Sequence, residues 1–213
     1  MPLPSTLPKP ETSNEKQATK LCFASNNAHK LDEIRPLLPP GLELLSLADI
    51  GCHEELPETQ DTLEGNARQK ADYVRQHYGV ACFADDTGLE VTALDGAPGV
   101  YSARYAGPQR EAADNVAKLL RELAGRPDRT AQFRTVVALA QADGTTRTFA
   151  GAVAGRVAEA PRGAGGFGYD PVFVPTGGDG RTFAEMSGAE KNQISHRARA
   201  VAGLVAYLER FRG

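Results

Sequence analysis

The sequence predicts an α/β fold in which helices flank a central mixed β-sheet and two lobes enclose a cleft. Two observations support this prediction. Short apolar runs alternate with segments whose apolar residues recur every three or four positions, which is typical of strands and helices in turn. Residues 132–141 and 145–157 are rich in β-forming residues and are separated by the turn sequence Ala-Asp-Gly-Thr, which indicates a hairpin.

The first half of the chain supplies most of the alternation. Its expected elements are a strand at 21–24, a polar loop at 25–30, a helix that continues through Leu31, a strand at 43–47, a helix at 62–77 and a strand at 80–84. The last of these strands is entirely apolar, so we expect it to be buried. It leads directly into Asp85-Asp86-Thr87-Gly88.

The second half begins with an amphipathic helix at 109–124, which Gly125 and Pro127 stop. The hairpin follows it. A glycine-rich stretch at 163–171 then leads into an apolar segment at 172–174, and a long helical region closes the chain.

Length and composition limit the classes of protein that fit. A chain of 213 residues with 41% hydrophobic content can form one domain, which we place at 20–213. Residues 1–19 are proline-rich and polar, so a disordered extension is expected there. The net charge of −3 argues against nucleic-acid or membrane partners. Without a signal peptide or an apolar run near the ~18 residues of a membrane span, a cytoplasmic protein is expected.

The loop at 25–30 (SNNAHK) lies between a predicted strand and a predicted helix. Backbone amides at such a junction, together with the ammonium of Lys30, can hold phosphate oxygens. The spacing is not that of a Walker A loop. The alternative is a solvated turn with no ligand.

Two adjacent carboxylates, Asp85 and Asp86, directly follow the buried strand at 80–84. Carboxylates that face one crevice repel each other, and a divalent cation relieves that repulsion. Hard oxygen ligands favour Mg²⁺, and Glu58 could supply a further carboxylate. The alternative is that one of the aspartates caps a turn before Gly88.

Two further segments carry side chains that suit a nucleotide base. Around Phe167, glycines allow the backbone to approach a ligand, and the ring offers a surface on which a base can stack. The alternative is a tight turn in which the ring packs in the core. On one straight helix Lys191 and His196 would lie about 140° apart and could not face one ligand. Ser187 and Ser195 are positioned to cap two successive helices, which removes this difficulty.

These segments together resemble the inosine triphosphate pyrophosphatase family, also called dITP/XTP pyrophosphatases, from about Leu21 to the C-terminus. The loop at 25–30 resembles the family pattern T/S-x-N-x-x-K, and residues 84–89 (ADDTGL) resemble its ADDSGL. The segments GAPGVYSARY at 96–105, GGFGYDP at 165–171, and EKN with SHR at 190–197 are similar to further family motifs. The acidic segment at 58–67 departs from the family's ETGxTFxENA, because Gly65 stands where Glu is common.

The resemblance implies hydrolysis of ITP, dITP and XTP to the monophosphate and pyrophosphate by a Mg²⁺-dependent homodimer. It assigns Asp86 as the catalytic residue, with Glu58 and Asp86 binding the metal and Asp85 as an alternative in one of these roles. The implied substrate-binding residues are Ser25, Asn26, Asn27, Ala28, His29, Lys30, Thr87, Phe167, Gly168, Tyr169, Asp170, Lys191, His196 and Arg197.

Base selection would follow from hydrogen-bonding groups. Asp170 would accept from N1–H, while Lys191, His196 or Arg197 would donate to O6. Two rival hypotheses are a Maf-like pyrophosphatase that acts on pyrimidine nucleotides and a nucleotide sensor without catalysis. The segments around Phe167 and His196 favour the purine enzyme over the Maf-like alternative.

Overall fold

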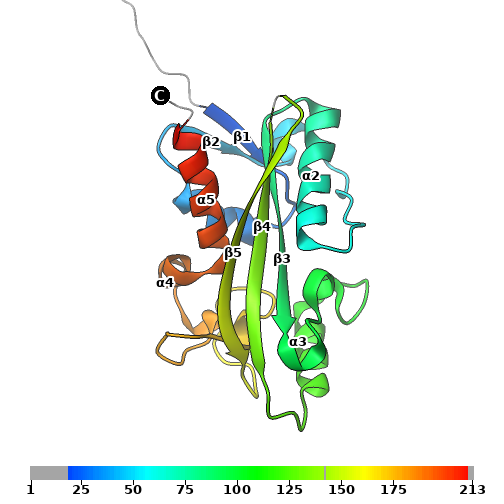
Figure 1. Ribbon diagram of the computed structural model, residues 1–213, viewed down its shortest axis with the longest axis vertical. Coiled ribbons are helices and arrows are strands. Elements are labelled where there is room, and N and C mark those ends of the chain that lie inside the picture. Colours follow the sequence, from blue (N-terminus) through cyan, green and yellow to red (C-terminus); the bar gives the residue numbers. More distant parts are fainter. Residues whose placement is uncertain (1–18, 142, 211–213) are drawn as a thin grey trace, which may run out of the picture.

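The structure is a computed structural model that describes residues 19–141 and 143–210 (Figure 1). Within them, the strands are β1 (Thr19–Phe23), β2 (Leu42–Leu45), β3 (Cys82–Val91), β4 (Thr130–Ala140), β5 (Thr146–Val157) and β6 (Phe173–Pro175). They form one sheet in the order β2-β1-β3-β4-β5-β6. Pairing is parallel from β2 to β3 and antiparallel from β3 to β6, which confirms the mixed sheet and the β4–β5 hairpin.

Five α-helices surround this sheet in the described residues. They are α1 (Ala28–Ile34), α2 (Leu63–Tyr78), α3 (Ala112–Glu122), α4 (Gly188–Ile194) and α5 (His196–Arg210). Short 3-10 turns connect them: η1 (Arg35–Leu37), η2 (Ala48–Ile50), η3 (Thr92–Leu94), η4 (Gly99–Arg104), η5 (Asp170–Val172) and η6 (Phe183–Glu185).

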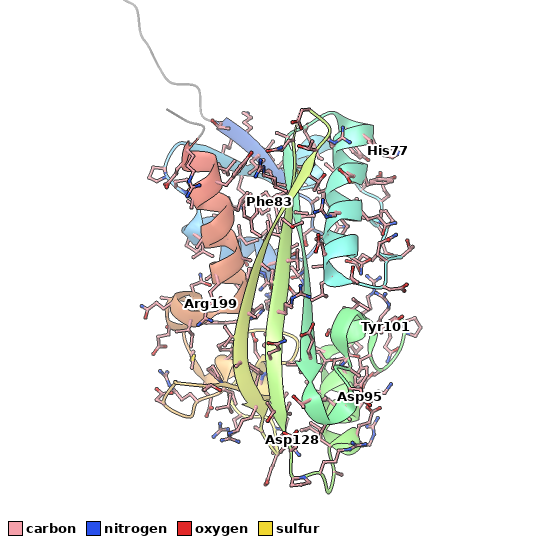
Figure 2. All side chains as sticks on the ribbon, viewed as in Figure 1. His77, Phe83, Asp95, Tyr101, Asp128 and Arg199 are labelled. Carbon is pink, nitrogen blue, oxygen red and sulfur yellow. The ribbon has the colours of Figure 1, made fainter. Side chains whose placement is uncertain are left out.

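The long strands β3, β4 and β5 run through both halves of the molecule and divide its core (Figure 1). At one end, α2 packs on one face of the sheet through Ala67 and Ala71, and α5 packs on the other through Val201 and Leu204. Phe83, labelled in Figure 2, belongs to the α5 side. At the other end, α3 and the segments after β5 form a third cluster. This arrangement agrees with the expected two lobes.

Strand β3 extends much further than the apolar segment at 80–84 predicts. It continues through Asp85 and Asp86 to Val91, so the two carboxylates lie within the strand and do not follow it. The reason is the partner strand, because Asp85 and Asp86 pair with Val137 and Val136 of β4. Successive strand residues point to opposite faces, so the two aspartates face opposite sides of the sheet.

Other element boundaries also differ from the predictions. Helix α1 begins at Ala28, inside the expected loop, because the Asn27 side chain caps it by accepting from the Lys30 amide. Of the extension expected at 1–19, residues 1–18 lie outside the described residues, whereas Thr19 pairs with Leu42 at the start of β1. In the described part of the chain, no helix is both long enough and apolar enough to cross a membrane.

Candidate active site

A cavity of about 570 Å³ lies between the two lobes. Its lining includes most of the residues expected to bind substrate or metal, namely Ser25, Asn26, Asn27, His29, Lys30, Glu58, Asp86, Thr87, Phe167, Gly168, Tyr169, His196 and Arg197. Ala28, Asp170 and Lys191 do not line it. Lys191 instead lines a neighbouring cavity of about 530 Å³, and the two cavities share His29 and Phe167.

One end of the cavity holds the two carboxylates expected to bind metal. Glu58 and Asp86 are joined by Lys70, whose Nζ lies 2.6 Å from Glu58 Oε1 and 3.5 Å from Asp86 Oδ1. Within the described residues, no group of three or more His, Cys, Asp or Glu side chains is placed to hold a metal ion. A metal at this end would therefore need ligands beyond these two carboxylates.

The two carboxylates differ in their protonation chemistry. Burial raises the pKa of Asp86 above its ordinary value, and Lys70 and Lys30 offset this effect only in part. Burial acts on Glu58 in the same direction, but the charge and hydrogen bond of Lys70, together with the charges of Lys30 and Arg110, outweigh it, so the pKa of Glu58 is lowered. Asp86 is thus the better proton acceptor of the pair.

Asp85 lies on the opposite face of β3 and is fully buried. Its carboxylate accepts from Lys30 Nζ at 2.8 Å and from Arg197 Nε at 3.2 Å. Although burial alone would raise its pKa, these two cations hold the pKa of Asp85 far below the ordinary value. Asp85 therefore positions two cations and does not line the cavity, which argues against it as an alternative base or metal ligand.

A buried chain of alternating charges continues from Asp85 toward the other end of the cavity. Arg197 also pairs with Glu33, and Glu33 Oε1 accepts from Lys191 Nζ at 2.6 Å. Lys191 in turn pairs with Asp170. Arg197, Glu33 and Lys191 each have an opposite charge on either side, which offsets the cost of burial. Glu33 was not among the expected site residues.

Phe167 lines both cavities. Its ring stacks on His29 with 5.5 Å between ring centroids, and Lys191 Nζ lies 5.0 Å from its centroid. The Phe167 amide donates to Asp170 Oδ2 at 2.9 Å. The Asp170 carboxylate is therefore engaged by the Phe167 amide and by Lys191, and its direct contact with a base stays a prediction.

His196 is buried beside the cavity, where its ring stacks on Phe133 with 4.5 Å between centroids. Its Nδ1 atom is buried and has no hydrogen-bond partner among the described residues. Burial, with the positive charges of Arg197 and Lys191, lowers the pKa of His196 well below its ordinary value. The imidazole is therefore neutral at physiological pH.

The expected break between two helices is present at Ser195. Helix α4 begins with a capping box between Ser187 and Glu190, and Ser195 Oγ accepts from the Ala198 amide at 3.1 Å to cap α5. The break lets Lys191 and Arg197 meet at the same carboxylate, Glu33, from different helices.

The segment at 96–105 supplies the floor of the cavity through η4. Ser102 Oγ accepts from the Leu89 amide at 2.9 Å, and the Ser102 carbonyl accepts from Tyr169 Oη at 2.9 Å. Gly88 is required here, because a Cβ at this position would lie 2.5 Å from the Gly99 carbonyl oxygen. On the outside of η4, Tyr101, labelled in Figure 2, is exposed.

The sequence matches the model of the Ham1 family over residues 21–207. The chain belongs to the Ham1 family. Curated relatives include the dITP/XTP pyrophosphatases of Porphyromonas gingivalis, 56% identical over 89% of this chain and 97% of the relative, and of Flavobacterium johnsoniae, 53% identical over the same shares.

Solved structures of Ham1 family proteins have the same fold. The Staphylococcus aureus Ham1 protein is 38% identical and superposes with a TM-score of 0.81, covering 90% of this chain and 98% of its own. A nucleoside-triphosphatase / dITP/XTP pyrophosphatase from Mycobacterium abscessus is 45% identical with a TM-score of 0.72, covering 88% of this chain and 99% of its own. The Ham1 fold thus accounts for nearly the whole described chain.

Proposed function

We propose that this protein hydrolyses non-canonical purine nucleoside triphosphates such as ITP, dITP and XTP to the monophosphate and pyrophosphate. The observation that carries the proposal is that one cavity joins the carboxylates of Glu58 and Asp86 to an aromatic and cationic pocket around Phe167 and Arg197. The dITP/XTP pyrophosphatase names of relatives more than 50% identical support the same activity.

Mg²⁺ is the proposed cofactor, held by Glu58 and Asp86. The residues fit a cation, because the Lys70 ammonium already lies within 3.5 Å of both carboxylates. Mg²⁺ favours hard oxygen ligands and commonly completes its coordination with water and substrate phosphates. When bound, it would neutralise charge on the pyrophosphate leaving group.

In the proposed reaction, Asp86 orients water for attack on the α-phosphorus and accepts its proton. A bond forms between the water oxygen and the α-phosphorus, and the bond from that phosphorus to the oxygen bridging to the β-phosphorus breaks. Asp86 lines the cavity, so its carboxylate can reach a water and a substrate bound there. Lys30 and the amides of residues 25–30 bind phosphate oxygens and stabilise the developing charge.

The proposed base pocket uses Phe167 for stacking and Arg197 and His196 as donors to O6. The unpartnered Nδ1 of His196 supports a polar ligand in this region. Hypoxanthine and xanthine carry O6, whereas adenine carries an amino group there, which would leave the buried donors unpaired. Asp170 and Lys191 act indirectly: Asp170 accepts a hydrogen bond from the Phe167 amide and pairs with Lys191, which holds the Phe167 loop in place.

A pyrophosphate-release assay with ITP, dTTP and UTP, each with and without Mg²⁺, tests the proposal against its rivals. Mg²⁺-dependent release from ITP alone supports it. Preference for dTTP or UTP would favour a Maf-like activity, and tight ITP binding without release would favour a nucleotide sensor.

We also propose a cytoplasmic homodimer without nucleic-acid or membrane partners. The family resemblance supports the dimer, and the net charge of −3 supports the absence of a nucleic-acid partner. Sedimentation velocity at micromolar concentration should give the mass of a dimer, and a monomer mass would remove that part of the proposal.

A further inference from the structure

Asn66 of α2 is a buried polar residue whose amide contacts the candidate catalytic carboxylate. Only 1% of its surface is exposed. Its Nδ2 donates to Asp86 Oδ2 at 3.1 Å, and its Oδ1 accepts from the backbone amide of Gln60 at 2.9 Å. Gln60 lies two residues after Glu58 in the chain. One side chain thus connects the carboxylate on β3 to the loop that carries the second carboxylate.

Lys70 makes a parallel connection one helical turn later. It lies on the same face of α2 as Asn66, since residues four apart share a helix face. Lys70 contacts Oδ1 of Asp86, whereas Asn66 contacts Oδ2. The two oxygens of Asp86 are therefore held separately, one by a cation and one by a neutral amide.

The two contacts differ in what a bound metal would do to them. A divalent cation between Glu58 and Asp86 would compete with the Lys70 ammonium for Oδ1, because both are cations attracted to the same oxygens. Asn66 contacts the other oxygen, Oδ2, and its amide carries no charge, so a cation does not repel it. Its hydrogen bond is the contact that can keep Asp86 oriented when the metal binds.

Gly65 makes the hydrogen bond between the Gln60 amide and Asn66 Oδ1 possible. A Cβ at Gly65 would lie 2.7 Å from Gln60 Cβ, so a side chain there would push the loop away from α2. With glycine, the Gln60 amide reaches Asn66 Oδ1. Gly65 thus permits the close approach of the loop that follows Glu58.

We propose that Asn66 is a positioning residue for the reaction: it fixes the orientation of Asp86 and its distance from the Glu58 loop. This inference rests on the proposed function for its kinetic consequence. Residues that orient a metal ligand through a hydrogen bond commonly change metal affinity or activity by about ten- to a hundredfold when replaced.

The test is Asn66→Ala in the full chain, with Gln69→Ala as the matched control. Gln69 is on the same helix and holds the same loop through two hydrogen bonds to Thr59, of 3.0 and 2.9 Å, but neither bond reaches Asp86. We expect Asn66→Ala to lower kcat for ITP by about ten- to a hundredfold with KM changed less than about threefold. Gln69→Ala should leave kcat within about twofold.

Calorimetric titration with Mg²⁺ alone gives a second reading that does not depend on turnover. Asn66→Ala should bind Mg²⁺ about tenfold or more weakly than wild type, whereas Gln69→Ala should bind it normally. If Asn66→Ala does not fold, Asn66→Ser is measured by the same criteria.

Unchanged kcat and unchanged Mg²⁺ affinity in the folded variant would overturn the inference, as would equal losses in Asn66→Ala and Gln69→Ala. Failure of the wild type to release pyrophosphate from ITP would instead overturn the proposed function. In that case the Mg²⁺ titration would still decide the role of Asn66.

Discussion

Asp85 and Asp86 are adjacent in the chain but occupy opposite faces of β3, where they meet different partners. Asp85 is enclosed by Lys30 and Arg197, whereas Asp86 faces α2 and the cavity. Alternation along a strand thus gives two identical side chains different pKa shifts, lowered for Asp85 and raised for Asp86.

Exchanging each aspartate for asparagine should separate these roles. Asp86→Asn should lower kcat by about a hundredfold or more with little loss of stability, because it removes the base but keeps the shape. Asp85→Asn should lower the free energy of unfolding by about 3 to 5 kcal/mol, because Lys30 and Arg197 lose their buried counter-charge. Urea denaturation and steady-state kinetics measure both. Near-normal kcat in Asp86→Asn would contradict the assignment.

A single substitution at Asp170 tests how the base is selected. Its carboxylate accepts from the Phe167 amide and pairs with Lys191, so Asp170→Asn should misplace the Phe167 loop. We expect kcat/KM for ITP and ATP to fall in parallel, by about tenfold or more. A loss confined to ITP, with ATP turnover preserved or raised, would mean that Asp170 contacts the base directly.

The elements that local sequence determines were predictable. Periodicity gave α2 to within one residue at each end, and the capping serines gave the break between α4 and α5. The continuation of β3 beyond Ala84 was not predicted, because residues 85–88 are polar or glycine and are held in the strand by pairing with β4. Long-range pairing overrode the local pattern there.

Site residues that belong to one short sequence motif were predictable. Site residues that reach the cavity from a different helix or a distant part of the chain were harder to predict. The loop at 25–30 and the carboxylates Glu58 and Asp86 do meet in one cavity. Lys70 and Asn66 were missed, although both interrupt the apolar face of α2, which was a usable signal. Glu33 gave no such signal, because its partners Lys191 and Arg197 are more than 150 residues away in the chain.

The helix break at Ser195 should matter for binding as well as for stability. Ser195→Ala removes the cap of α5 and should cost about 1 kcal/mol of unfolding free energy. Ser187→Ala, at the exposed start of α4, should cost a similar amount. Only Ser195→Ala should also raise KM for ITP, because His196 and Arg197 follow it directly. Equal KM values in the two variants would contradict this role.

At the scale of the whole molecule, the buried charges make stability depend on pH. His196 remains neutral in the fold because its pKa is lowered well below its ordinary value, whereas in the unfolded chain it takes up a proton as pH falls through about 6.5. The contribution of this residue is therefore present above that pH and is lost as pH falls below it, by up to about 1.4 kcal/mol per pH unit.

Denaturation of wild type and His196→Phe between pH 7.5 and 5 measures this effect, with the exposed His77 changed to Gln as the control. The loss of stability with acid should be shallower in His196→Phe, because no proton is taken up at that position on unfolding, and unchanged in His77→Gln. Equal slopes in all three proteins would show that His196 titrates normally in the fold.

The two lobes bring phosphate-binding, metal-binding and base-binding groups to one cavity, so the central claim concerns which nucleotide is cleaved and where. A competition assay with equimolar ITP and ATP, Mg²⁺ and wild-type protein tests it most directly, with all products identified. We predict IMP and pyrophosphate in equal amounts while ATP remains intact. Comparable loss of ATP, or release of inorganic phosphate with IDP, would contradict the account.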